Sequence, residues 1–101
     1  MPEAARCCGV DTVSTGHGCD GTTTTEQGSD TVFVNGNGLV RSGDLNRSHT
    51  RPVGPACVPH TVALSSYSST VFANGKNAGR KGDSYGSEVI TSGSDNVIIG
   101  G

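Results

Sequence analysis

The side chains that could do chemistry are three histidines and four cysteines, placed unevenly along the chain. In order they are Cys7, Cys8, His17, Cys19, His49, Cys57 and His60. All three histidines and Cys57 lie in two variable loops, each of which follows a Gly/Asp signature. Three imidazoles and one thiolate complete a tetrahedral zinc site, and four protein ligands leave no open position for catalysis. The sequence therefore predicts one structural zinc ion.

The spacing of these residues favours a shared site. Cys57 and His60 are separated by two residues, as ligand pairs in tight zinc knuckles often are. His49 lies five residues after Asp44, so the second loop offers ligands at both of its ends. The first loop offers His17 at a comparable place, and the third has neither His nor Cys. The expected ligands are His17, His49, Cys57 and His60, with Cys19 as the alternative.

The main rival to zinc is a disulfide framework, because four cysteines is an even number. Residues 1–20 contain no continuous apolar segment of a secretory signal, which predicts synthesis in the cytosol. Thiols stay reduced there, so metal binding is favoured over disulfides. Of the adjacent Cys7 and Cys8, at least one is expected to face the core, where cysteine behaves as a small hydrophobe.

These residues must be positioned by a repeated β unit. The segment Ser29–Asp44 recurs as Ser68–Asp83, with nine of sixteen positions identical, and a worn copy of its first half follows at 94–101. The second and third units begin with Arg-x-Gly-Asp, and Arg6, Gly9 and Asp11 are a looser first copy. A variable loop, a Thr-Val-Phe-like strand and an Asn-Gly turn follow, and the last two are worn in the third unit. We expect a single domain over 1–101, with units at about 6–40, 41–79 and 80–101.

The expected fold class is all-β. The Thr-Val-Phe segments have the β-branched and aromatic residues that suit strands, and Asn-Gly favours a type I′ hairpin turn. No window shows the apolar period of a helix. Three units are too few for a propeller, so we expect them to close around a pseudo-threefold axis. The alternative is a small duplicated β domain without symmetry.

Composition limits the stability and the partners of this chain. Leu, Ile, Val and Phe make only 19 of 101 residues, Trp is absent and Gly makes 16. A core this thin usually needs a staple such as a metal ion. The formal net charge of −2 argues against a nucleic-acid partner, which would require a basic surface. The longest apolar runs are far shorter than a transmembrane helix needs.

We do not expect an enzyme. Asp11, Asp44 and Asp83 recur with the repeat, which indicates turn-capping carboxylates paired with the repeated arginines. No Ser-His-Asp order stands out, and the histidines are already assigned to the metal. Two other classes remain open, namely a small zinc enzyme and a disulfide-stabilised secreted binding module.

The chain resembles the PAAR-repeat proteins. Residues 1–6, Met-Pro-Glu-Ala-Ala-Arg, are similar to the proline-alanine-alanine-arginine start that names the family, although Glu3 interrupts the string. The resemblance continues through Gly9–Thr12, Gly16–Cys19 and both repeat signatures, and so covers the whole chain. It implies a small conical β domain whose apex holds zinc through three histidines and one cysteine.

The resemblance also implies a function. PAAR-repeat proteins cap and sharpen the trimeric β-helical spike of contractile injection machines, with one chain per trimer. The machine is a phage tail or a type VI secretion system, in which the tip meets the target membrane and can carry effector cargo. We therefore expect a location on the virion spike or delivery by secretion. With no room for a fused toxin domain before Gly101, we expect a bare tip.

Overall fold

A computed structural model of the protein describes residues 2–100. Within this range the chain forms ten short strands and no helix, which confirms the all-β prediction. The strands are β1 (Thr12–Ser14), β2 (Thr22–Thr24), β3 (Phe33–Val34), β4 (Asn37–Gly38), β5 (His49–Val53), β6 (Ala56–His60), β7 (Phe72–Ala73), β8 (Lys76–Asn77), β9 (Ser84–Tyr85) and β10 (Glu88–Ile90). Met1 and Gly101, the ends of the predicted domain and of its third unit, lie outside the described residues.

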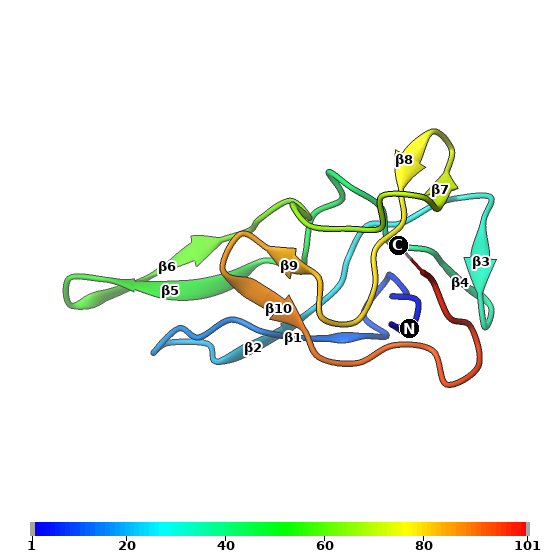
Figure 1. The fold of residues 1–101 in the computed structure, drawn as a ribbon. Coiled ribbons are helices and arrows are strands. Elements are labelled where there is room, and N and C mark those ends of the chain that lie inside the picture. Colours follow the sequence, from blue (N-terminus) through cyan, green and yellow to red (C-terminus); the bar gives the residue numbers. More distant parts are fainter. Residues whose placement is uncertain (1, 101) are drawn as a thin grey trace.

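The strands form three hairpins and one four-stranded sheet, which combines strands of the first and third units. The sheet has the order β2-β1-β10-β9, so the first and third units pair directly through Val13 and Ile90. The hairpins are β3-β4, β5-β6 and β7-β8. The molecule is elongated, with extents of 41 × 24 × 22 Å, and β5-β6 projects at one end (Figure 1). The small hairpins β3-β4 and β7-β8 lie at the opposite end (Figure 1).

The two Asn-Gly segments form the turns that the sequence predicts. Asn35 and Gly36 have φ values of 52° and 83°, and Asn74 and Gly75 have 56° and 78°. A type I′ turn needs positive φ at both central residues, and these residue types adopt it at least cost. The turns therefore join β3 to β4 and β7 to β8 with two residues each.

The repeated segments around β3, β7 and residues 98–99 alternate between the core and the surface. Val34, Ala73 and Ile99 occupy equivalent repeat positions and pack together in one buried cluster. The residue before each of them points outward, as expected from the two-residue period of extended chain. A second cluster includes Val13, Val40, Tyr85 and Ile90. Cys7 also belongs to it, whereas Cys8 is exposed, so the prediction that one of this pair faces the core is confirmed.

The repeated serine of each unit makes a hydrogen bond to another unit. Ser29 Oγ bonds Asn74 Oδ1 at 2.5 Å, and Ser94 Oγ donates to Asn35 Oδ1 at 2.6 Å. Ser68 Oγ donates to the carbonyl of Gly100 at 2.7 Å. Unit one thus contacts unit two, unit two contacts unit three, and unit three returns to unit one.

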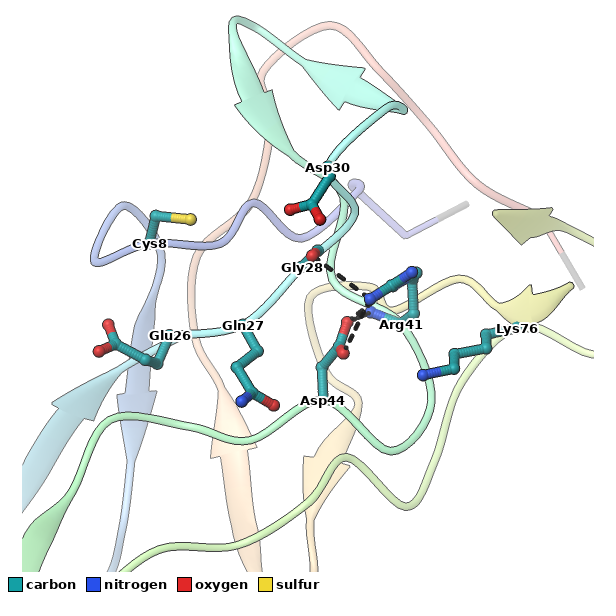
Figure 2. A pocket seen from close by; sticks show the side chains of 8 residues that line it. All are labelled: Cys8, Glu26, Gln27, Gly28, Asp30, Arg41, Asp44 and Lys76. Atoms are coloured by element: carbon teal, nitrogen blue, oxygen red, sulfur yellow. Dashed lines mark hydrogen bonds and ion pairs between the residues drawn. The ribbon is translucent and has the colours of Figure 1, made fainter. Parts of the chain in front are cut away.

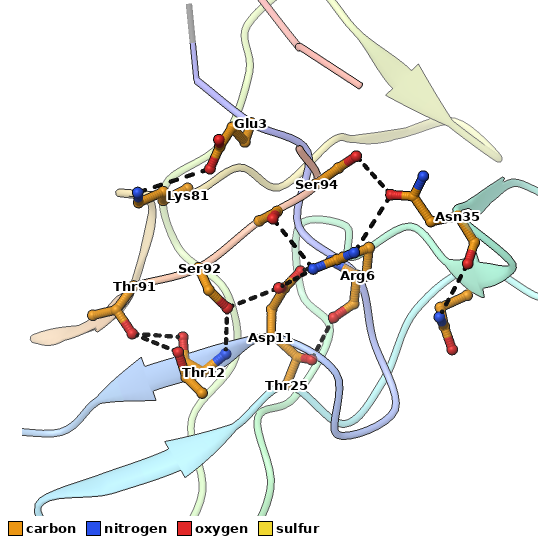
Figure 3. A network of polar contacts seen from close by, with 12 residues as sticks. Glu3, Arg6, Asp11, Thr12, Thr25, Asn35, Lys81, Thr91, Ser92 and Ser94 are labelled. Carbon is orange, nitrogen blue, oxygen red and sulfur yellow. Dashed lines mark hydrogen bonds and ion pairs between the residues drawn. The ribbon is translucent and has the colours of Figure 1, made fainter. Parts of the chain in front are cut away.

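The repeated Arg and Asp residues have the structural role that the sequence predicts. The backbone N–H of Arg6, Arg41 and Arg80 donates to the aspartate of the same unit at 2.6–2.9 Å. Each guanidinium also bonds that carboxylate. Figure 3 shows Arg6 lying between Asp11 and Asn35, close to Ser94 of the third unit. These pairs fix the turn at the start of each unit.

Tyr85 has a hydroxyl that makes no hydrogen bond with the part of the chain that is described, although its side chain is fully buried. Burial raises its pKa, and Asp44 and Asp11 raise it further, so the hydroxyl stays protonated. Because a buried unsatisfied hydroxyl costs about 1–3 kcal/mol, Tyr85→Phe is expected to raise the free energy of unfolding by about 1 kcal/mol. Urea denaturation of both proteins measures this change. A loss of more than about 1 kcal/mol would show that the hydroxyl has a partner.

Candidate metal centre

Three histidines and one glutamate meet between the β5-β6 hairpin and the four-stranded sheet. His49 begins β5, His60 ends β6 and Glu88 begins β10. His17 comes from the loop between β1 and β2. One donor atom from each of the four residues lies within 4.8 Å of the others. The structure thus brings together all three histidines that the sequence singled out.

The carboxylate of Glu88 lies at the centre of the group. Its Oε2 is 2.5 Å from His17 Nε2, 2.8 Å from His49 Nε2 and 3.2 Å from His60 Nε2. The three imidazole centroids are 5.1–5.5 Å apart. Four donor atoms therefore converge on one small volume, as the ligands of a metal ion must.

Neighbouring groups fix two of these side chains. Glu88 Oε1 accepts a hydrogen bond of 2.7 Å from Asn46 Nδ2, which leaves Oε2 for the histidines. Asn46 is buried, and its Oδ1 accepts from the backbone N–H of Val62 at 2.9 Å. His49 Nδ1 lies 2.9 Å from the Arg47 carbonyl, and this contact orients the ring so that Nε2 faces Glu88. Nε2 is the ring nitrogen that a metal ion would bind in place of its contact with Glu88 Oε2.

The protonation states suit metal binding. Burial alone would raise the pKa of Glu88, but hydrogen bonds from His49, Asn46 and His17 outweigh it and lower that pKa. Burial lowers the pKa of His60, and the positive charge of Arg51 adds to this effect, against the opposing carboxylate of Glu88. An anionic carboxylate and a neutral imidazole are the forms that bind metal.

Cys57 is not part of this group, which corrects the ligand set expected from the sequence. Its sulfur is bonded to Cys19, the alternative ligand, so neither is available as a thiolate. The physical reason is that Cys57 lies on β6 rather than in a turn. Residues three apart on a strand point to opposite faces. His60 pairs across the hairpin with His49, on the face where the histidines meet Glu88. Cys57 pairs with Pro52 and points to the other face.

The cysteines also correct the expectation of reduced thiols. The structure contains two disulfides, Cys7–Cys8 and Cys19–Cys57, and no free cysteine. The disulfides do not exclude a metal ion, because no cysteine belongs to the group of potential ligands. The Cys19–Cys57 disulfide and that group both link the β1–β2 loop to the β5-β6 hairpin.

Glu88 is the residue that the sequence reasoning missed. The third unit has neither Cys nor His, and its candidate ligand is a carboxylate instead. Glu88 lies five residues after Asp83, as His49 lies five after Asp44. The repeat register alone therefore contained a signal for it. In the first unit the histidine comes one residue later, because His17 lies six residues after Asp11.

The donor set limits which ions fit. Three imidazole nitrogens and one carboxylate oxygen suit borderline divalent ions such as Zn²⁺, and the absence of thiolate from the group disfavours soft ions such as Cu⁺. The exposed fractions of His49 and Glu88 are 5% and 1%, so a charged carboxylate is held in a nearly water-free place. Such a carboxylate gains most from a cation. The residues present fit a bound metal ion.

A separate open pocket has no comparable chemistry. Arg41, Asp44, Lys76 and the exposed Cys8 line part of it (Figure 2). Arg41 is bonded to Asp44 and to the carbonyl of Gly28, as the dashed lines in Figure 2 show. Its guanidinium and the Asp44 carboxylate therefore serve the fold.

Comparison with protein-family models finds no match to this chain, and comparison with curated protein sequences finds no close match either.

Proposed function

We propose that this protein is the metal-stabilised tip of a trimeric β-helical spike in a contractile injection machine. In this role the hairpins β3-β4 and β7-β8 and the last residues face the spike. The metal centre and β5-β6 lie toward the opposite, leading end. The protein acts mechanically and catalyses no reaction. Its place is on a phage tail or a secretion spike, where the leading end meets the target membrane and effector cargo can attach.

One observation carries this proposal, namely three exposed apolar side chains at equivalent repeat positions. Phe33, Phe72 and Ile98 expose 60%, 56% and 48% of their surface. They are the outward neighbours of the three core residues Val34, Ala73 and Ile99. Figure 1 shows β3 and β7 at the end of the molecule away from β5-β6, where the chain before the C-terminus also lies.

Three similar apolar positions suit a trimeric partner. A single chain that caps a trimer meets three identical surfaces, and repeated side chains let it bind all three in the same way. Exposed aromatic side chains at such a place are typical of binding sites rather than of free surface. The hydrogen bonds that run from unit to unit support the same interpretation, because they return from the third unit to the first.

The metal we propose is zinc, held by His17, His49, His60 and Glu88. Four protein ligands are typical of structural zinc, and carboxylate oxygen is among its normal ligands. Bound there, zinc would supply a fixed cross-link and no reactive group. It would join the β1–β2 loop, the β5-β6 hairpin and β10, which come from all three units. This link would stiffen the leading end, which has few buried apolar residues.

The partner surface can be tested by charge substitution. Phe33→Glu/Phe72→Glu is expected to weaken binding to the trimeric spike protein encoded beside this chain by at least 100-fold, because two desolvated aromatic anchors each contribute about 2 kcal/mol. The measurement is a titration by calorimetry, with a stoichiometry of one chain per trimer. Val53→Glu is the matched control, since Val53 is 50% exposed but lies on β5.

The proposal fails if wild type binds no such trimer, or if Val53→Glu weakens binding as much as the double variant does. Circular dichroism must show that both variants remain folded. A second candidate function is a disulfide-stabilised binding module that acts outside the cytosol, which the two disulfides favour. That function predicts loss of target binding after reduction and no one-to-three complex.

A further inference from the structure

The loop that carries His17 is attached to the β5-β6 hairpin independently of the metal. Cys19, two residues after His17, is bonded to Cys57 of β6. Asp20 Oδ2 accepts hydrogen bonds from the backbone N–H and the hydroxyl of Thr50 on β5, at 2.8 and 2.6 Å. The backbone N–H of Asp20 also donates to the Thr50 carbonyl at 3.3 Å. We call these contacts the clamp.

His17 is the ligand that depends most on such help. His49 and His60 begin and end paired strands, and Glu88 begins β10. His17 instead lies in an irregular loop, and its side chain is 18% exposed, against 2% for His49. Within the loop its backbone N–H donates to Thr15 Oγ1 at 3.1 Å. This hydrogen bond lies within the loop and does not attach the loop to the hairpin.

The clamp lies on the other face of the hairpin from the ligands. Cys57 and Thr50 belong to the cross-strand pairs Pro52–Cys57 and Thr50–Pro59, whereas His49 pairs with His60. By strand alternation the two sets point to opposite faces. The clamp therefore holds the loop around the edge of the hairpin, with Cys19 and Asp20 on one face and His17 reaching the other. Its sulfurs lie outside the ligand group.

We propose that the Cys19–Cys57 disulfide and Asp20 form a positioning clamp for His17, so that the redox state of this disulfide controls metal affinity although no sulfur binds the metal. A dithiol reductant would transfer two electrons and two protons to the S–S bond, giving two thiols and its own cyclic disulfide. Of the clamp, only the contacts of Asp20 with Thr50 then remain, so His17 is held less firmly before metal binding. Ordering that is made in advance increases affinity.

This inference rests on the proposed metal centre and not on the spike partner. It makes the disulfide and the metal mutually supporting links between the same two segments. A metal ion bound to His17 and His60 would hold Cys19 near Cys57, because these cysteines lie two and three residues from the two ligands. In turn, the disulfide holds His17 in place for the metal. The two links are therefore expected to form cooperatively.

The test uses Co²⁺ as the probe, titrated into the full-length protein and followed by visible absorption. Oxidised protein is compared with protein reduced by excess dithiothreitol, from which the reductant has been removed anaerobically. Reduction is expected to weaken Co²⁺ binding by about 10–100-fold, the range seen for lost outer supports of metal ligands. No thiolate-to-cobalt charge-transfer band is expected in either state.

Three variants make the result specific. Cys19→Ser/Cys57→Ser should bind as weakly as the reduced protein and show no response to reductant. Cys7→Ala/Cys8→Ala keeps the clamp and should respond as wild type does, which excludes an effect of the other disulfide. Asp20→Ala keeps the disulfide and should weaken binding by about 10-fold. Far-ultraviolet circular dichroism checks the fold of each variant.

Four outcomes would overturn the proposal. Equal affinity in both redox states would show that the clamp does not position His17. Tighter binding after reduction, with a charge-transfer band, would show that Cys19 or Cys57 is a ligand. Loss of the redox response in Cys7→Ala/Cys8→Ala would assign it to the other disulfide. If oxidised wild type binds no Co²⁺, the metal centre itself is wrong and the clamp falls with it, while spike binding remains a separate measurement.

Discussion

Removal of the proposed metal ion by a chelator at neutral pH is expected to lower the melting temperature by about 15–30 °C. A ligand at 1,000 times its Kd adds about 4 kcal/mol to the free energy of unfolding, and each kcal/mol shifts Tm by about 4–8 °C in a domain of this size. The physical reason is that Glu88, with 1% of its surface exposed, would lose the cation that balances its charge. The measurement is differential scanning calorimetry of metal-loaded and chelated protein.

His49→Ala is the matched control for this prediction. His49 is the most buried of the three histidines, and its loss should remove high-affinity metal binding. The variant should melt near the temperature of chelated wild type and should not respond to chelator. An unchanged Tm after complete removal of metal from wild type, verified by elemental analysis, would contradict the structural role of the ion.

Replacement of the repeated arginine in the first unit is expected to have the second large effect. Arg6→Met should lower the free energy of unfolding by about 3 kcal/mol at neutral pH, because it leaves a buried carboxylate without its cation. Asp11 is fully buried and Arg6 Nη2 lies 2.8 Å from its Oδ1 (Figure 3). Among the described residues, only the backbone N–H of residue 6 and the Ser92 hydroxyl would still bond that carboxylate. Urea denaturation gives the value.

The pH dependence of this loss has a definite sign. Burial would raise the pKa of Asp11, but hydrogen bonds from Arg6 outweigh it and lower that pKa. A lowered pKa stabilises the fold above the unfolded value of about 4, and this contribution disappears as the pH falls through the folded value. The difference between wild type and Arg6→Met should therefore be full at pH 7 and should shrink below about pH 4.

An exposed ion pair in the same protein provides the control. Arg47 Nη2 lies 2.7 Å from Glu26 Oε1, but both side chains are about half exposed. Arg47→Met should cost less than about 1 kcal/mol, since water and salt screen such pairs. If Arg6→Met costs no more than Arg47→Met, then the repeated Arg–Asp pairs do not stabilise the turns, and their recurrence needs another explanation.

The sequence by itself was sufficient for the local features that depend on near neighbours. The Asn-Gly turns and the Arg–Asp pairs form within a few residues, so their side chains specify them. The Thr-Val-Phe strands are shorter than predicted, because β3 and β7 begin at the phenylalanine and the third copy forms no strand among the described residues. The repeat also predicted which histidines would meet, because equivalent loops belong at one end of the domain. For the same reason it could have indicated Glu88, had carboxylates been compared at the position five residues after each aspartate.

The pairing of the cysteines and the place of Glu88 beside the three histidines were decided by the tertiary structure. Cys57-x-x-His60 has the spacing of a zinc knuckle, and sequence spacing does not distinguish a turn from a strand. Residues 49–60 form an extended hairpin, so Cys57 points away from His60 and meets Cys19, which is 38 residues distant. Because side chains alternate along a strand, Cys57 forms its disulfide on one face of the hairpin, and His49 and His60 meet Glu88 on the other.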